Sequence, residues 1–375
     1  MKKLVVLLLV FSLLLGMTAC SSTPSGDTTT PPKDSNKVDV GIVLPTKDEP
    51  RWIQDETRFK EALQNTDYSV EVLFSQGSSA KEKENVDALI AKGIKVLIIC
   101  PQDGSAAAAA VEAAKKEGIK VIAYDRLITG TDAVDYYVTF DSVAVGAAQA
   151  QYLVDQAGTG KGNPLYLYAG AATDNNAFLF FEGAWNVLQP KIADGTFVIK
   201  NSSEAVALQA KATLTRDEMG KIIGQVTTNW DFNEAKNKAE AHLTAAKPAD
   251  KGNVFILAPN DGTARAIADA FAADTAVTSY KVTGQDAEKA SVQYIIDGKQ
   301  SMTVFKDVRT LVKDSIDMAV AILGGKEPQT TGSYDNGKIQ VKAKQTEVVV
   351  VTSDNVKAAL VDSGYYPAGD FTNLK

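Results

Sequence analysis

The sequence has few of the residues on which disulfides, metal sites and nucleophilic catalysis depend. Its 375 residues include two cysteines, Cys20 and Cys100, and a single histidine, His242. Cys20 falls in a leader segment, and the one cysteine left makes neither an intramolecular disulfide nor a zinc cluster. A single histidine argues against histidine-based metal sites and against Ser-His-Asp chemistry. We therefore expect no metal and no cofactor.

Positive charge is scarce as well. The chain has 39 lysines and arginines against 46 aspartates and glutamates, a formal net charge of −7, and it contains no basic run. Nucleic-acid binding draws most of its affinity from clustered positive charge on phosphate groups. The composition therefore predicts no nucleic-acid partner.

No apolar run is long enough to cross a membrane. The run from Leu4 to Leu15 follows Lys2 and Lys3, and it falls short of the roughly 20 residues that a spanning helix needs. The sequence Leu-Gly-Met-Thr-Ala-Cys then ends at Cys20 and resembles the end of a bacterial lipoprotein signal. We expect residues 1–20 to be a signal peptide, with Cys20 lipidated and the protein held outside the cytoplasm by lipid alone. An ordinary signal peptide with a chance cysteine is the alternative.

The stretch after Cys20 contains no large apolar side chain over residues 21–36. Such a segment cannot bury enough surface to offset the entropy of ordering it. We interpret it as a flexible tether and expect the folded part to begin near Lys37. The remaining roughly 340 residues suit two domains better than one.

From Lys37 onward, apolar runs typical of strands alternate with helical patterns. We expect strands at 38–44, 70–74, 96–99, 121–124, 136–140, 165–168, 254–257, 281–283 and 303–305. Strands that are apolar throughout and joined by helices indicate parallel sheets covered on both faces, in an α/β fold. Ligands of such sheets bind beyond the carboxyl ends of the strands.

Polar, charged and aromatic side chains follow six of these strands. In chain order they are Lys47, Arg51 and Trp52; Asp125 and Arg126; Asp174, Asn175 and Asn176; Asn260 and Asp261; Gln285 and Asp286; and Lys306. Carboxylates, amides and cations form the paired hydrogen bonds that sugar hydroxyls require. Because Asp174 and Asp261 precede helical stretches, helix capping is the alternative role for them.

The three tryptophans divide into two groups. Trp52 and Trp230 have the charged neighbours Arg51 and Asp231, so we regard them as candidates for stacking on a sugar ring, with core packing as the alternative. Trp185 has helical spacing to Phe181 and Leu188, which predicts a place in the core.

Taken together, these segments resemble the xylose-binding and multiple-sugar-binding periplasmic proteins of ABC importers. The resemblance runs from about residue 38 to 373 and is carried by Pro45-Thr46-Lys47, Arg51-Trp52, Ala123-Tyr124-Asp125-Arg126-Leu127-Ile128, Asp174-Asn175-Asn176-Ala177-Phe178, Asn260-Asp261-Gly262, Gly284-Gln285-Asp286-Ala287-Glu288 and Val304-Phe305-Lys306-Asp307. It implies a type I periplasmic-binding fold, which has two similar Rossmann-like lobes with parallel sheets, three hinge crossings and a sugar between the lobes.

The resemblance also implies the binding residues and the lobe boundaries. The ligand set is Arg51, Trp52, Asp125, Arg126, Asn175, Asn176, Trp230, Asn260, Asp261, Asp286 and Lys306, with the choice between Asn175 and Asn176 left open. The N-terminal lobe would comprise residues 37–141 and 306–338, and the C-terminal lobe residues 142–305 and 339–375. The hinges would lie near Asp141-Ser142, Phe305-Lys306 and Lys338–Val341. The stretch 201–228 is longer than the family pattern, which makes the place of Trp230 less secure.

A binding protein is the leading hypothesis for function. The expected ligand is an aldopyranose such as xylose, glucose or galactose, and the expected partners are the permease subunits of an ABC importer, with the receptor itself a monomer. Asp125 and Asp286 could be the paired carboxylates of a glycosidase. Their Arg and Asn neighbours, however, favour the ionised form of both carboxylates, which then only accept hydrogen bonds, so we expect no enzyme. The alternative is a receptor that presents sugar to a membrane kinase or chemoreceptor. A repressor is not expected, because the sequence lacks the DNA-binding helix pair that a repressor needs.

Overall fold

The computed structural model describes residues 37–64 and 66–375. The predicted signal peptide (1–20), the lipidation at Cys20 and the predicted tether (21–36) lie outside the described residues. Within the described ranges, no helix is both long enough and apolar enough to cross a membrane.

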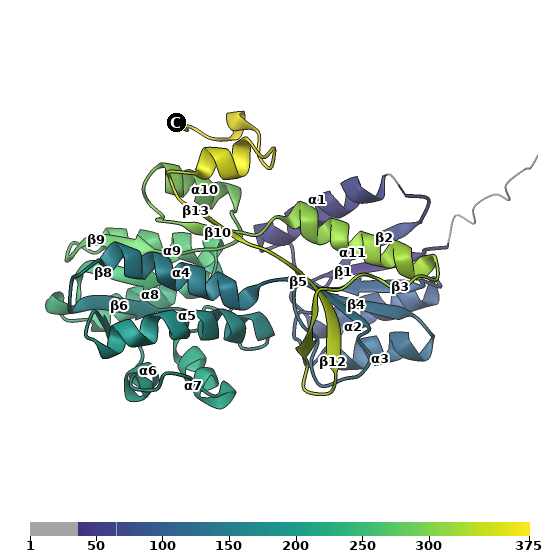
Figure 1. Cartoon of the computed structure of the whole chain (residues 1–375), viewed down its shortest axis with the longest axis horizontal. Helices are drawn as coiled ribbons and strands as arrows, with labels where there is room; N and C mark the ends of the chain where they lie inside the picture. Colours follow the sequence, from purple (N-terminus) through teal and green to yellow (C-terminus); the bar gives the residue numbers. More distant parts are fainter. Residues whose placement is uncertain (1–36, 65) are drawn as a thin grey trace, which may run out of the picture. The chain divides into compact units, whose positions relative to one another are not determined.

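The first lobe, here called the N-terminal lobe, is built on a seven-stranded sheet (Figure 1). The sheet has the order β11-β12-β5-β4-β3-β1-β2. All neighbouring strands run parallel except β11, which pairs antiparallel with β12. Its strands are β1 (Val40–Leu44), β2 (Val70–Phe74), β3 (Val96–Ile99), β4 (Lys120–Tyr124), β5 (Tyr136–Phe140), β11 (Gly332–Asp335) and β12 (Gln340–Thr346). Every residue of β1 is buried, as expected for a central strand covered on both faces.

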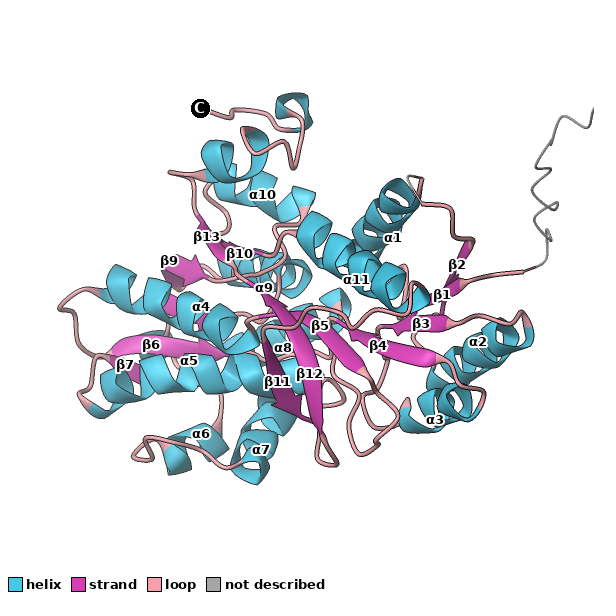
Figure 2. Ribbon diagram, turned by 45° about the vertical axis from the view of Figure 1, so that its right-hand side comes forward, coloured by secondary structure: helices cyan, strands magenta, loops and turns pink. Residues whose placement is uncertain are grey.

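Helices cover both faces of this sheet (Figure 2). One face packs against α1 (Pro50–Leu63) and α11 (Val308–Leu323). The opposite face packs against α2 (Ser79–Ala91) and α3 (Ala108–Lys116). Because α1 begins just after β1, its first turn lies at the carboxyl edge of the sheet, where ligands bind in such folds.

The second lobe, here called the C-terminal lobe, has a four-stranded parallel sheet in the order β7-β6-β8-β9. A separate antiparallel pair, β10 and β13, accompanies it. The strands are β6 (Asn163–Leu167), β7 (Phe197–Ile199), β8 (Gly252–Leu257), β9 (Val277–Val282), β10 (Thr303–Phe305) and β13 (Val349–Val351). The helices are α4 (Ser142–Ala157), α5 (Asn175–Ala193), α6 (Ser203–Leu208), α7 (Arg216–Val226), α8 (Phe232–Ala245), α9 (Asp261–Ala273) and α10 (Lys289–Ile296).

Two glycines bring α4 and α5 unusually close together. A Cβ added at Gly146 would lie 1.8 Å from the carbonyl oxygen of Phe180, and one added at Gly183 would lie 2.0 Å from that of Val143. No larger residue fits at either position without moving a backbone. Since α4 starts directly after β5, this contact fixes the start of α5 relative to the first crossing between the lobes.

The structure contradicts one of the three predicted crossings. Asp141 caps α4 just after β5, and Asp307 caps α11 just after β10, so the first two crossings fall at 141–142 and 305–308. The predicted hinge at Lys338–Val341 is wrong, and so is the assignment of the residues from 339 through Thr346 to the C-terminal lobe. Strand β12 pairs in parallel with β5, so the chain stays in the N-terminal lobe through Thr346 and crosses only before β13.

The fold-class prediction of two α/β lobes with mostly parallel sheets is confirmed. All nine expected strands are present, with ends that differ by a few residues. Trp185 is buried in the core of the C-terminal lobe, as predicted. The stretch 201–228 contains α6 and α7, which pack onto that same core.

Candidate ligand-binding site

A pocket with about 300 Å³ of space not filled by protein atoms lies where the two lobes meet, at the carboxyl ends of their strands. Nine of the eleven residues predicted from the sequence line it: Arg51, Trp52, Asp125, Arg126, Asn176, Trp230, Asn260, Asp286 and Lys306.

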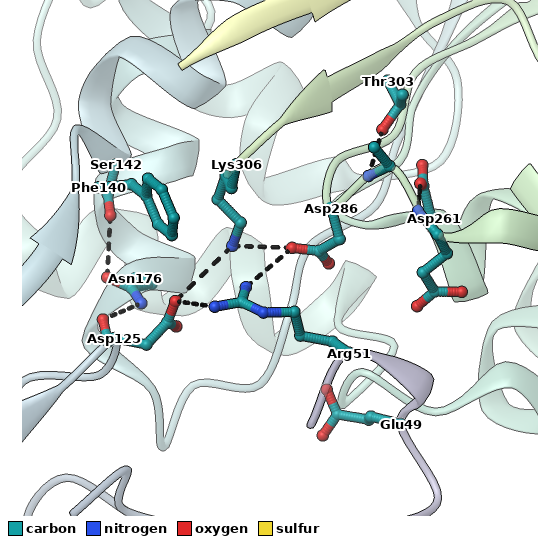
Figure 3. A network of polar contacts seen from close by, with 12 residues as sticks. Glu49, Arg51, Asp125, Phe140, Ser142, Asn176, Asp261, Asp286, Thr303 and Lys306 are labelled. Carbon is teal, nitrogen blue, oxygen red and sulfur yellow. Dashed lines mark hydrogen bonds and ion pairs between the residues drawn. The ribbon is translucent and has the colours of Figure 1, made fainter. Parts of the chain in front are cut away.

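Arg51 stands at the centre of a buried ion-pair network (Figure 3). Its Nε lies 2.7 Å from Asp55 Oδ2, its Nη2 lies 2.9 Å from Asp125 Oδ2, and its Nη1 lies 3.3 Å from Asp286 Oδ1. Lys306 Nζ also lies 2.8 Å from Asp286 Oδ1 and 4.0 Å from Asp125 Oδ2. Burying several charges costs several kcal/mol per ion, roughly, so such a network is expected at a functional site rather than as a source of stability.

The charge state of Asp125 follows from these neighbours. Burial alone would raise the pKa of its carboxyl group, but the cations Lys306, Arg51 and Arg126 outweigh burial and hold the pKa below its usual value. Asp125 is therefore ionised at neutral pH and acts only as a hydrogen-bond acceptor.

A second ion-pair group surrounds Arg126. Its Nε lies 3.1 Å from Asp174 Oδ2 in the other lobe, and its Nη2 lies 3.5 Å from Glu49 Oε1. Burial raises the pKa of both carboxyl groups, and the guanidinium of Arg126 opposes that rise. Its guanidinium also lies 5.0 Å from the ring centroid of Trp52, within the range of a cation–π contact.

Amide side chains complete the contact between the lobes. Asn176 Nδ2 donates to the backbone carbonyl of Asp125 at 2.9 Å, and its Oδ1 accepts from Ser142 Oγ at 3.0 Å. Asn260 caps α9 and also lines the pocket. The pocket thus gathers groups from both lobes, together with Lys306 at the second crossing.

Three pocket residues have left-handed backbone conformations. Asp125, Trp230 and Asp286 have φ angles of 60°, 62° and 99°, which are uncommon for residues other than glycine and concentrate at functional sites. The ring of Trp230 lies directly over Gly170, where an added Cβ would be 2.0 Å from the indole. A side chain at position 170 would therefore displace Trp230.

Some buried polar atoms of the pocket lining have no hydrogen-bond partner in the described part of the chain. Among them are the donor Nε1 of Trp230 and the acceptor Oε1 of Gln285. Buried polar groups are nearly always paired, so an unpaired donor and acceptor at one pocket indicate a ligand that supplies both functions. A hydroxyl group does so.

Two predicted residues lie outside the pocket lining. Asn175 Oδ1 accepts from Arg216 Nη1 at 2.8 Å in the C-terminal lobe. Asp261 is fully buried and accepts from the backbone N–H of Glu288 at 2.8 Å and from Gln300 Nε2 at 2.7 Å. We therefore do not include either residue in the proposed ligand set, and we assign to Asp261 the support of the loop that carries Asp286.

Four further residues line the pocket but were not among the predicted ligands: Glu49, Asp174, Phe180 and Gln285. Asp174 and Gln285 stand in the quoted motifs. Asp174 does cap α5, as the alternative interpretation held, through its bond with the backbone N–H of Asn176. Phe180 follows within α5, where the pattern of apolar residues gave no reason to distinguish it from the core.

Two α/β lobes joined by three crossings, with a polar pocket between them, define a solute-binding receptor. The chain belongs to the periplasmic binding protein family, because the family model described as "Periplasmic binding protein domain" matches residues 40–327. This membership places it among proteins that bind solutes outside the cytoplasm.

The similar proteins include receptors for sugars. A carbohydrate transporter solute-binding protein from Chloroflexus aurantiacus, solved in complex with D-glucose, is 79% identical with a TM-score of 0.89, over 90% of this chain and 99% of that one. An ABC transporter solute-binding protein from Clostridium phytofermentans with bound β-D-glucose is 34% identical with a TM-score of 0.79, over 88% and 99%. The multiple sugar-binding periplasmic protein SbpA of Azospirillum brasilense is 36% identical over 92% of this chain and 94% of that protein. The predicted family is therefore confirmed.

Proposed function

We propose that this receptor captures a neutral monosaccharide between its lobes, with D-glucose as the first candidate, and delivers it to an ABC importer. The observation that carries the proposal is the pairing of charges in the pocket. Arg51 and Lys306 lie between Asp125 and Asp286, and Arg126 lies between Asp174 and Glu49. Because each cation already has carboxylate partners, an anionic ligand would meet mostly acceptors, whereas hydroxyl groups can donate to them.

The choice of glucose is supported by the two similar receptors that were solved with that sugar. Trp52 and Trp230 remain the proposed stacking partners for the sugar ring, one from each lobe. We propose binding without catalysis, because the pocket carboxylates are held by cations in structural pairs and the relatives are solute-binding proteins.

Calorimetric titration of the purified protein tests this function. D-glucose is expected to release or absorb heat with a 1:1 stoichiometry, to raise the melting temperature by mass action and to change tryptophan fluorescence. D-xylose and D-galactose define the breadth of specificity, and D-glucuronate tests the preference for a neutral ligand. Heat with an amino acid and none with any monosaccharide would overturn the proposal.

The lipid anchor is a further part of the proposed function and rests on the sequence alone. Attachment through Cys20 followed by the segment 21–36 would keep a monomeric receptor at the outer face of the membrane, within reach of its permease.

A further inference from the structure

The end of the chain belongs to the C-terminal lobe but also touches the N-terminal one. After β13, residues 352–371, here called the C-terminal segment, form a π-helical turn at Lys357–Val361 and a 3-10 turn at Ala368–Asp370. Figure 1 shows this segment beside α10. Its apolar side chains share a small core with Val292 of α10 and Phe305 of β10.

Tyr365 is anchored within that core. Its side chain is 3% exposed, and its ring packs against Phe305 with centroids 4.6 Å apart and planes at 70°. The neighbouring Tyr366 donates its hydroxyl to the backbone carbonyl of Ala287, in the loop that carries Asp286. Tyr365 therefore moves with the C-terminal lobe.

The polar atoms of Tyr365 nevertheless contact the N-terminal lobe. Its hydroxyl donates to Gln54 Oε1 in α1 at 3.0 Å, and its backbone carbonyl accepts from Arg58 Nη2 at 3.4 Å. The guanidinium of Arg309 in α11 lies 5.1 Å from the centre of its ring, and Arg309 Nη1 donates to the carbonyl of Ser363 at 3.0 Å. The C-terminal segment thus bridges α1 and α11 to the other lobe.

The position of these contacts relates them to the binding site. Gln54 lies one turn along α1 from Arg51, which holds Asp125 and Asp286, and Phe305 directly precedes Lys306. The hydrogen bond between Tyr365 and Gln54 therefore fixes the distance between the start of α1 and the C-terminal lobe. At this distance Arg51 reaches Asp286.

We propose that Tyr365 is a positioning residue that stabilises the closed arrangement of the lobes and so sets the affinity for sugar. This inference rests on the proposed function. An interaction present only when the lobes meet raises the fraction of binding-competent protein, and the apparent dissociation constant falls in proportion. Tyr365 is not among the residues that line the pocket, so we assign its effect on affinity to its contact with α1.

Tyr365→Phe tests the proposal by removing one hydroxyl. The expected result is an apparent Kd for D-glucose about fivefold higher, equivalent to roughly 1 kcal/mol at 1.4 kcal/mol per tenfold, with faster sugar dissociation in stopped-flow fluorescence. Small-angle scattering of the ligand-free variant is expected to give a larger radius of gyration than the wild type. An unchanged Kd together with an unchanged ligand-free radius would overturn the proposal.

A matched control and a double variant separate positioning from mere folding. Tyr166→Phe removes a hydroxyl that donates at 3.0 Å to the carbonyl of Asp250, wholly within the C-terminal lobe, and it is expected to leave Kd unchanged. Gln54→Met removes the acceptor, so the double variant Tyr365→Phe/Gln54→Met is expected to bind no more weakly than either single variant. Additive losses would instead contradict the bond.

Failure of the proposed function gives a different pattern. If the wild type binds no monosaccharide, the function is wrong, and the ligand-free radius of gyration of Tyr365→Phe alone then decides whether Tyr365 holds the lobes together.

Discussion

Arg126 Nε lies 3.1 Å from Asp174 Oδ2, and this ion pair joins the N-terminal lobe to the C-terminal lobe across the pocket. Asp174 also caps α5 by accepting from the backbone N–H of Asn176. One carboxylate thus orients the helix that presents Asn176 and neutralises a cation of the opposite lobe. The same contacts therefore close the lobes and form the pocket.

Replacing Asp174 with asparagine is expected to weaken sugar binding by about 10- to 100-fold. The amide oxygen can still cap α5, so the loss, roughly 1.4–2.8 kcal/mol at 1.4 kcal/mol per tenfold, reflects the buried ion pair with Arg126. Calorimetric titration with D-glucose measures the change. Asp194→Asn is the control, since Asp194 pairs with Lys161 at 3.0 Å on the exposed surface of the same lobe. Equal affinities in the two variants would show that the pair between the lobes does not contribute.

Asp286 and Asp261 are expected to respond in opposite ways. Asp286→Asn tolerates the positive φ of that position but removes the carboxylate that lies 2.8 Å from Lys306 and one of the three carboxylates that pair with Arg51. Sugar binding is therefore expected to fall by about 100-fold with little change in melting temperature. Asp261→Ala removes two buried hydrogen bonds behind the pocket, so its melting temperature is expected to fall clearly, with a smaller loss of affinity. Thermal unfolding and titration of both variants distinguish the roles, and a reversed pattern would refute them.

The difference between these two aspartates indicates how far sequence reasoning reaches. Each follows a strand, and strand ends of parallel sheets meet at one edge, so both could be predicted to lie near a ligand. Whether a side chain points into the pocket or behind it depends on the loop conformation. At Gly284, an added Cβ would lie 2.2 Å from Asp261 Oδ1, so it is the absence of a side chain there that lets Asp261 turn away from the pocket.

The misplaced third hinge has a related cause. Strand β12 alternates exposed and buried residues over its first half because it lies near the edge of the sheet, beside the antiparallel β11. Such a strand lacks the continuous apolar run that made β1 and β3 easy to predict. The pairing of β12 with β5, which keeps it in the N-terminal lobe, joins residues about 200 positions apart and leaves no local pattern in the sequence.

Lipidation at Cys20 can be tested by one substitution. Cys20→Ser removes the thiol that would carry the lipid, so the protein is expected to move from the membrane fraction to the soluble extracytoplasmic fraction. Fractionation followed by immunoblotting measures the change, and Cys100→Ser, at a buried cysteine of the fold, is the control that is expected to remain with the membrane. A Cys20→Ser variant that stays with the membrane would show that another feature anchors the chain.

Glu82 in α2 is expected to make stability depend on pH. Its carboxyl group accepts from the backbone N–H of Gln102 at 2.7 Å, and burial raises its pKa to about 7. Between pH 4.5 and 7 the folded state therefore holds a proton that the unfolded state has lost. The free energy of unfolding falls as pH rises through this window, because ionisation of a buried carboxyl group is unfavourable.

Glu82→Gln is expected to remove this dependence, because the amide can still accept from Gln102 but does not ionise. Between pH 4.5 and pH 8, the free energy of unfolding of the variant should rise relative to that of the wild type by on the order of 3 kcal/mol. This is the equivalent of the raised pKa of Glu82 at 1.36 kcal/mol per pH unit. Urea unfolding at a series of pH values measures it. Taking the difference between variant and wild type cancels other titrating groups, such as His242, whose pKa burial lowers to about 4. Glu84→Gln, at an exposed position of the same helix, should show no such gain, and an equal gain there would assign the effect to net charge rather than to burial.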